Sequence, residues 1–412
     1  MNWKRKSERN WGRLGMKCKL EEICLFRMEK TNVANLTTKT YISTENMLPN
    51  KSGIVNATSL PTVNLTQAFE NGDVLVSNIR PYFKKIWKAR INGGCSNDVL
   101  VFMAKENIDS DFLYYVLADD AFFAYAMATS KGTKMPRGDK KSIMQYKVPC
   151  YDVETQQKIA SILKSIDEKI ELNNAINNNL EQQAHVIFKK CFIDNPENSK
   201  WSTGTFSELI KSISNGDWGK EAPTGNNTEK VYCIRGADIP EVKSGNKGKM
   251  PTRYILPKNF ATKQLMAGDI VVEISGGSPT QSTGRCTAIT QSLLDRYDSG
   301  MVCTNFCKAM KPKDGYSLFI YYYWQYLYGK GVFFSYENGT TGIKNLDFSG
   351  FIETEPILIP PVDKIVVFDD YCKSIFSQIF TNGKQNEHLA MLRDTLLPKL
   401  MSGELDVSDI DL

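Results

Sequence analysis

Few residues in this sequence have the type and spacing that catalysis needs. The chain of 412 residues has two histidines, His185 and His388, and both fall in long stretches with a helical pattern. Neither a phosphate-binding loop nor a G-x-S-x-G nucleophile elbow occurs. Ile359-Pro360-Pro361-Val362 is the nearest string to the tetrapeptide that holds a flipped base in DNA amino-methyltransferases, but it lacks both the polar and the aromatic residue. Asp363-Lys364 stands outside any acidic cluster and is expected to cap a helix. We therefore predict a chain that is not an enzyme.

Metal, disulfide and membrane chemistry are also disfavoured. The ten cysteines form no CxxC pairs and have no nearby histidines, so we expect reduced thiols and no metal site. No apolar run approaches the roughly 18 residues of a membrane span. The basic N-terminus lacks the apolar segment of a signal peptide. These features predict a cytoplasmic protein without a membrane partner.

The charge is unevenly distributed along the chain. Residues 1–153 hold 23 basic and 15 acidic residues, a net charge of +8 within a chain total of +5. Residues 194–363 are neutral overall, and residues 364–412 carry a net charge of −3. A globular domain as basic as the first suits a polyanionic partner. A basic solvated surface without a partner is the alternative.

Two long helical stretches must position whatever lies between them. In each, apolar residues and two asparagines recur at alternating steps of four and three, which indicates a helix packed along another helix. Buried asparagines fix the register of such a pair, because only one alignment matches their amides. Two unrelated core helices would leave the shared Asn-x-x-x-Asn-x-x-Leu spacing to chance. We expect an antiparallel pair joined by Ile166, Ile170, Asn173, Asn177, Leu180, Ile375, Ile379, Asn382, Asn386 and Leu389.

The chain also contains a long internal repeat. Gly72-Asp73 before three apolar residues is answered by Gly268-Asp269, and Cys95-Ser96-Asn97 by Cys303-Thr304-Asn305. Further matches follow in the same order at slowly drifting offsets, which indicates a duplicated unit of globular domain plus long helix. Each domain mixes short strands with an aromatic helix, expected at 111–127 and 316–328, so the predicted class is α/β (mixed α+β). The predicted domains are 1–153, 154–193 (central helix), 194–362 and 363–412 (C-terminal helix and tail).

Several motifs resemble those of one family. The segments are Pro149 with Glu154–Ile159, Leu180–Ala184 with Phe188–Phe192, Leu396–Leu405, Tyr41–Asn46 and Ile234–Ile239. With these motifs the sequence is similar, over nearly its whole length, to the specificity subunits of type I restriction-modification systems. A departure is the start of the second long helix, where Asp363-Lys364-Ile365-Val366 replaces the Glu-Thr-Gln-Gln-Lys motif of the first.

The resemblance implies a division of labour among subunits. Each globular domain would be a target-recognition domain that reads one half of a bipartite site in double-stranded DNA, with the helices as spacer. Methyltransferase subunits, expected to number two, would dock on the helices. Endonuclease/translocase subunits would join them to cut unmodified DNA. S-adenosylmethionine, ATP and Mg²⁺ are expected on those partner subunits, and no cofactor is expected in this chain.

Base readers need bidentate or amide side chains at loop tips, with lysine or arginine nearby for phosphates. An ordinary solvated loop is the alternative for each single residue. The candidates in the first domain are Ser77, Asn78, Arg80, Lys84, Lys85, Lys88, Thr133, Lys134 and Arg137. Those in the second are Ser275, Ser278, Thr280, Gln281, Arg285, Thr340, Thr341, Lys344 and Asn345. The charge asymmetry predicts that the first domain contributes more of the salt-dependent affinity.

Two other functions remain open at this level. One is the recognition part of a fused restriction-methyltransferase, which the missing donor-binding and base-flipping motifs disfavour. The other is a coiled-coil adaptor without a DNA role, which the basic first domain disfavours. A DNA-binding titration across salt concentrations separates these possibilities.

Overall fold

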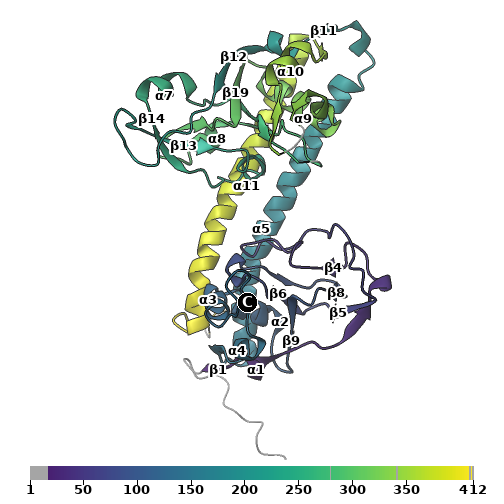
Figure 1. Cartoon of the computed structure of the whole chain (residues 1–412), viewed down its shortest axis with the longest axis vertical. Helices are drawn as coiled ribbons and strands as arrows, with labels where there is room; N and C mark the ends of the chain where they lie inside the picture. Colours follow the sequence, from purple (N-terminus) through teal and green to yellow (C-terminus); the bar gives the residue numbers. More distant parts are fainter. Residues whose placement is uncertain (1–16, 279, 340–341, 408–409, 411–412) are drawn as a thin grey trace, which may run out of the picture. The chain divides into compact units, whose positions relative to one another are not determined.

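The computed structural model describes residues 17–278, 280–339, 342–407 and 410 (Figure 1). Their contacts divide the chain into two compact units. The first unit combines residues 1–168 with 389–412, and the second comprises residues 169–388. Each unit therefore contains one globular part and a segment of each long helix, α5 (Val153–Phe188) and α11 (Val362–Ser402).

A four-stranded antiparallel sheet, in the order β2-β9-β6-β7, is the centre of the first unit. A second sheet has the order β3-β5-β8-β4, and β1 pairs with β10. The strands are β1 (Lys17–Lys19), β2 (Cys24–Phe26), β3 (Lys30–Asn32), β4 (Tyr41–Ile42), β5 (Leu65–Phe69), β6 (Val74–Ser77), β7 (Ile86–Lys88), β8 (Gly93–Cys95), β9 (Val99–Ala104) and β10 (Lys147–Pro149). The helices are α1 (Leu20–Ile23), α2 (Ser110–Ala118), α3 (Asp120–Ala128) and α4 (Lys140–Ile143).

Side chains on the two faces of the central sheet enter different cores. Val74 and Val76 belong to a large cluster that includes residues of α2, α3 and α5. Leu75, between them, belongs to a smaller cluster shared with Ile42 and Phe69 of the second sheet. This alternation follows from the period of two along a strand. The central sheet is thus covered by helices on one face and by the second sheet on the other.

The aromatic helix expected at 111–127 is instead two helices. Asp119, in an extended conformation, ends α2 and begins α3, and its carboxylate accepts a hydrogen bond from the backbone N–H of Ala121 at 3.0 Å. Aspartate favours this capping position because it satisfies an N–H that the first helical turn leaves free. The aromatic residues Phe112, Phe122 and Phe123 are buried, so they are core residues.

The central sheet of the second unit has the order β12-β19-β15-β17. The strands of this unit are β11 (Ser202–Gly204), β12 (Ile210–Asn215), β13 (Glu229–Ile234), β14 (Thr252–Ile255), β15 (Ile270–Glu273), β16 (Ser275–Gly276), β17 (Cys286–Ala288), β18 (Gly300–Cys303), β19 (Cys307–Pro312), β20 (Glu337–Asn338), β21 (Lys344–Leu346) and β22 (Ile357–Ile359). The helices besides α5 and α11 are α6 (Ile239–Lys243), α7 (Pro257–Lys263), α8 (Gln291–Leu294), α9 (Ser317–Gly329) and α10 (Phe348–Thr354). The aromatic helix α9 packs Tyr321, Tyr322 and Trp324 fully inside.

The two units repeat one topology. Each central sheet has four strands. Taken in chain order, the fourth strand lies between the first and the second, and the third pairs with the second at the edge, as in β2-β9-β6-β7 and β12-β19-β15-β17. Each unit also contains one short parallel pair, β4 with β8 and β13 with β18. Ile42 lies opposite Cys95 in the first pair, as Ile234 lies opposite Cys303 in the second. The tandem repeat predicted from the sequence is therefore confirmed.

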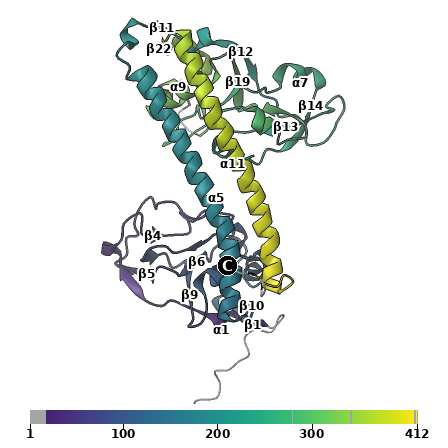
Figure 2. The ribbon, with the colours of Figure 1, turned by 180° about the vertical axis from the view of Figure 1, so that it is seen from behind.

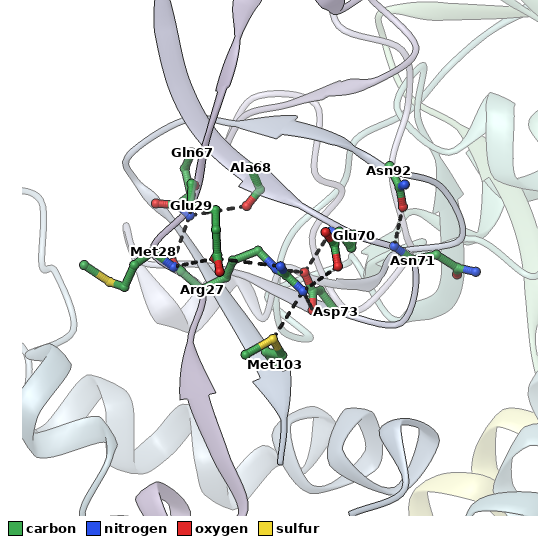
Figure 3. A network of polar contacts seen from close by, with 10 residues as sticks. All are labelled: Arg27, Met28, Glu29, Gln67, Ala68, Glu70, Asn71, Asp73, Asn92 and Met103. Carbon is green, nitrogen blue, oxygen red and sulfur yellow. Dashed lines mark hydrogen bonds and ion pairs between the residues drawn. The ribbon is translucent and has the colours of Figure 1, made fainter. Parts of the chain in front are cut away.

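The repeated Gly-Asp motif is a turn closed by its aspartate. The Asp73 carboxylate accepts a hydrogen bond from the Glu70 N–H at 2.8 Å, and the Asp269 carboxylate accepts one from the Met266 N–H at 2.9 Å. Asp73 is also paired with the buried guanidinium of Arg27, Nε to Oδ2 at 2.6 Å (Figure 3). These contacts fix the start of the second strand of each central sheet, and hence the position of the loop that follows it.

The long helices pair through their asparagines in the second unit. Asn173 donates to the side-chain oxygen of Asn386, and Asn382 donates to that of Asn177, each at 2.8 Å. The order of these pairs makes α5 and α11 antiparallel, and Figures 1 and 2 show them side by side. All four asparagines are buried. In the seam, Ile375 and Ile379 are buried as well, whereas Ile170 and Leu180 are half-buried.

The same helices close the core of the first unit. Ile166 is buried, and Leu389 is half-buried. Arg393 of α11 donates to the Asp167 carboxylate of α5 at 2.8 Å, and Tyr115 of α2 donates to the same carboxylate at 2.9 Å. Helix α5 is α-helical to Phe188 and continues as one π-helical turn over Lys189–Ile193.

A pair of glycines joins α11 to the globular part of the second unit. A Cβ on Gly383 would lie 1.9 Å from the carbonyl oxygen of Gly245, and one on Gly245 would lie 2.4 Å from that of Ile379. Ser244, next to this turn, accepts a hydrogen bond from the amide of Asn177 at 3.2 Å. A glycine in mid-helix costs helix stability, but here it permits the close approach of the turn.

Candidate nucleic-acid interface

Corresponding loops follow corresponding strands in the two units. After β4, the Ser43 N–H donates to the side-chain oxygen of Asn46. After β13, the Arg235 N–H donates to the Asp238 carboxylate at 3.1 Å. After β6, Ile79 forms a bridge with Arg137, and after β15, Ser275 pairs with Asn345. The repeat therefore brings the same three loop segments together in each unit. They are the loop after β4 or β13, the loop after β6 or β15, and the segment that contains Arg137 or Asn345. These segments contain most of the candidates from the sequence.

Two first-unit candidates were expected at a loop tip but lie at the end of a strand. Ser77 is the last residue of β6, is buried, and donates its hydroxyl to the Ile79 carbonyl at 3.1 Å. Asn78 is also buried, and its Oδ1 has no hydrogen-bond partner among the described residues. Both residues are buried because they lie where the strand ends. The hydrogen bond of Ser77 helps to shape the turn that begins at Arg80.

The lysines of the first unit differ in how far they are neutralised. Lys84 contacts the Asp120 carboxylate at 2.7 Å. Lys85 donates to the Thr44 carbonyl at 2.6 Å, and burial lowers the pKa of its amine. Lys88 is bonded to Asp111, a carboxylate that also pairs with a lysine of α5. Lys88 is therefore a link within the fold rather than an exposed phosphate contact, because β7 places it against α2.

Asp111 illustrates how burial and pairing compete. Burial raises the pKa of this carboxyl, but hydrogen bonds from Lys88 and then Lys164 outweigh it, so the pKa lies below its ordinary value. The carboxylate thus stays charged and keeps both lysines in place.

The second basic loop of the first unit lies beside the first. Lys131 and Arg137 exchange two backbone hydrogen bonds of 2.9 Å, and the Arg80 N–H donates to the Pro136 carbonyl at 2.8 Å. Thr133 and Lys134, at the tip between them, are exposed. Arg137 contacts an aspartate at 3.1 Å but remains exposed. Thr133, Lys134 and Arg137 therefore keep the accessibility that their predicted role requires.

The second-unit candidates divide in the same way. Arg285 donates to both oxygens of buried Glu273, at 2.6 and 2.7 Å, and this pairing raises the pKa of the guanidinium. Lys344 pairs with Glu337 at 2.7 Å. Arg285 and Lys344 are therefore engaged in ion pairs within the unit. Thr280, Gln281 and Asn345 are exposed, and Ser275 and Ser278 are half-buried. Thr340 and Thr341 lie outside the described residues.

A largely apolar pocket of about 530 Å³ opens among these loops in the second unit. Among the candidates that the structure describes, Ser275 lines it. Its other walls come from residues the sequence reasoning missed, because they lie on four separate segments: Trp218, Arg235, Asn305, Phe306 and Ile343. The guanidinium of Arg253 stacks on the Trp218 ring at 3.8 Å. The Cys-Thr-Asn repeat that contains Asn305 was the available signal.

Beside these loops the first unit also holds basic and aromatic residues that the candidates omitted. Lys51 reaches Asp120 at 2.8 Å beside Lys84. Tyr82 and Phe83 are partly exposed, with ring centroids 4.7 Å apart. The run Arg-Pro-Tyr-Phe-Lys-Lys, with aromatics between basic residues, was the sequence signal for them.

Comparison with known proteins finds similar chains in one family. Residues 16–182 match the model of the "Type I restriction modification DNA specificity domain". A "Type I restriction enzyme MjaIX specificity subunit" of Methanocaldococcus jannaschii is 27% identical over 323 residues, 74% of this chain and 71% of that protein. The chain therefore resembles the type I restriction-modification specificity subunits. The HindI specificity subunit of Haemophilus influenzae is 25% identical over 439 residues, 89% of this chain and 94% of that one.

A solved structure agrees with this family at the level of the fold. The type I restriction-modification S subunit from M. genitalium superposes with a TM-score of 0.55 at 16% sequence identity, over 96% of this chain and 98% of that one. Among the described residues of this chain, no group of three or more histidine, cysteine or acidic side chains could hold a metal ion. Within the same residues, no helix is long and apolar enough to cross a membrane.

Proposed function

We propose that this chain is the DNA-specificity subunit of a type I restriction-modification complex. Each globular domain reads one half of a bipartite, gapped site in double-stranded DNA, and the paired helices act as the spacer. The observation that carries the proposal is the repeat itself. Two domains of one topology present the same three loop segments, yet the residues on those segments differ, as at Ile79 against Ser275 and Arg137 against Asn345. Equal scaffolds with unequal loops suit the reading of two different short sequences.

The chemistry of the loops supports duplex DNA as the ligand. Phosphate contacts need lysine or arginine, which Lys134 and Arg137 offer in the first domain. Base edges need bidentate or amide groups, which Gln281 and Asn345 offer in the second.

Partner subunits complete the proposed complex. Methyltransferase subunits, two in number, dock on the helices and carry S-adenosylmethionine, and endonuclease/translocase subunits use ATP and Mg²⁺. This chain directs their activities without a catalytic group of its own. The match to the specificity-domain model and the relatives' names, which are those of restriction-enzyme specificity subunits, support this division.

The test is selection from a pool of randomised duplexes, using the full chain with its methyltransferase subunit. We expect the bound fraction to share two short words separated by a gap of fixed length and free sequence. Enrichment of a single ungapped word, or of no word, would contradict the proposal.

The spacer role has a separate test. Seven residues inserted into both helices, after Glu168 and before Leu389, add about 10 Å at 1.5 Å per residue. At 3.4 Å per base pair, the gap should lengthen by about three base pairs. The same insertion in an exposed loop, after Asn226, is the control and should leave the gap unchanged. A constant gap in the helix variant would exclude the spacer role.

A further inference from the structure

An exposed aromatic turn in the first domain has an uncommon backbone. The residues that flank it, Arg80 and Lys84, both adopt the left-handed conformation at φ 50°. Between them Pro81 is buried, whereas Tyr82 is 50% and Phe83 38% exposed. Only a few per cent of non-glycine residues have positive φ. The turn therefore presents two adjacent aromatic rings on a backbone that a flexible loop would not maintain.

A second strained turn supports the first. Asn50 and Lys51 also have positive φ, 57° and 61°, so four of the five such non-glycine residues in the described chain meet at this place. The Asn50 N–H donates to the Phe83 carbonyl at 2.8 Å, and the Lys51 N–H donates to the Lys84 carbonyl at 2.9 Å. Backbone strain of this kind persists only where its surroundings fix it, and it gathers at functional sites.

The charges around the turn are complementary to a polyanion. Lys51 and Lys84 share one carboxylate, that of Asp120, so together they leave a net positive charge. Lys85 lies 5.7 Å from the Phe83 ring centroid. Within the described part of the chain, Arg80 has no ion pair with an acidic side chain, and its buried Nε lacks an acceptor. The turn is thus an apolar tip with cations on both sides, next to the basic loop at Lys131–Arg137.

We infer that Tyr82 and Phe83 form an aromatic wedge that stacks on bases of the first half-site and opens a base step of the duplex. The inference rests on the proposed function and deepens it. Apolar side chains that enter a base step unstack it, and each aromatic–base contact contributes to affinity with little dependence on sequence. The flanking lysines hold the phosphates on either side, which supplies the register. The rigid turn matters because it presents the rings without a cost of ordering on binding.

The experiment uses the complex of the full chain with its methyltransferase subunit and a duplex that contains the selected site. 2-Aminopurine replaces single adenines along the first half-site, and its fluorescence rises where a step is unstacked. The variants are Tyr82→Ala/Phe83→Ala and the conservative Tyr82→Trp. Leu65→Ala, at an apolar residue of the same domain that is 57% exposed, is the matched control.

We expect fluorescence to rise at one step with the wild type, with Tyr82→Trp and with Leu65→Ala. The double alanine variant should lose this signal and bind about tenfold or more weakly, as expected for the loss of stacking. Its salt dependence should stay unchanged, because no cation is removed. Normal signal and affinity in the double variant would overturn the wedge. Loss of the methyltransferase subunit from this variant, with DNA binding intact, would instead assign the turn to a protein contact and also overturn it.

The outcomes also separate the wedge from the proposed function. If the wild-type complex bound no gapped site, the proposed function would fail, whatever the turn does. If it bound a gapped site with wild-type fluorescence in the double alanine variant, the function would stand and the wedge alone would fail.

Discussion

The amide pair of Asn177 and Asn382 gives the sharpest prediction about stability. Asn177 accepts from the Asn382 amide at 2.8 Å and donates to the carbonyls of Ile379 at 3.1 Å and Ser244 at 3.2 Å. Replacing either asparagine alone by leucine leaves the other amide buried without its partner. Such an unsatisfied group costs about 1–3 kcal/mol, so each single variant should lose roughly 3 kcal/mol once the other lost hydrogen bonds are included.

Replacing both asparagines should cost far less than the sum. Two leucines in the seam remove the unpaired amide and pack as an ordinary coiled-coil layer, so the double variant should unfold within about 1 kcal/mol of the wild type. The resulting coupling between the two positions, the sum of the two single losses less the loss of the double variant, is on the order of 5 kcal/mol. Urea unfolding followed by helical circular dichroism measures all four proteins, and Asn178→Ala, on the exposed side of the same helix, is the control.

Two results would refute this reasoning. Single variants as stable as the Asn178→Ala control would show that the amides are not paired inside the seam. Additive losses in the double variant would show that each asparagine acts alone.

Three further predictions concern other parts of the chain. Gly383→Ala should destabilise the second unit by about 1–3 kcal/mol through overpacking against Gly245, whereas Gly329→Ala, with open space around its Cβ position, should be neutral or stabilising in thermal unfolding; equal effects of the two substitutions would contradict this. Burial raises the pKa of Glu181, but its hydrogen bond from His185 and the nearby Lys243 outweigh it and the pKa lies below its ordinary value. The stability it contributes is therefore full above the unfolded-state pKa of about 4.3 and is lost as the pH falls, so Glu181→Gln should flatten the acid limb of a stability–pH profile; an unchanged limb would refute it. Lys134→Ala should lower the slope of log affinity against log salt by about one for every sequence tested, and a change confined to one sequence would assign it to base reading.

The repeat, the class of fold and the helix pair were predictable because their signals are local or periodic. The Gly-Asp turn depends on an aspartate that bonds three residues back, at Asp73 and at Asp269 alike. The asparagine pairs follow from a seam that allows one alignment. Gly383 was not predictable in its role, because the turn at Gly245 that requires a glycine there is distant in sequence.

The site was harder to predict because accessibility is set by partners distant in sequence. Lys88 is neutralised by Asp111, which lies on α2 and is distant from Lys88 in sequence. The guanidinium of Arg285 is bound by buried Glu273 on the neighbouring strand. The Tyr82–Phe83 turn depends on left-handed backbone at residues that are not glycine, which propensity alone does not indicate.

The most direct test of the central claim is methylation mapping after a domain exchange. The chain is expressed with its methyltransferase subunit, and residues 17–149 are replaced by the corresponding domain of another specificity subunit. If each domain reads one half-site, the methylated motif should be gapped and bipartite, and the exchange should change one word while the other word and the gap remain. A change in both words, or methylation of an ungapped word, would contradict the account.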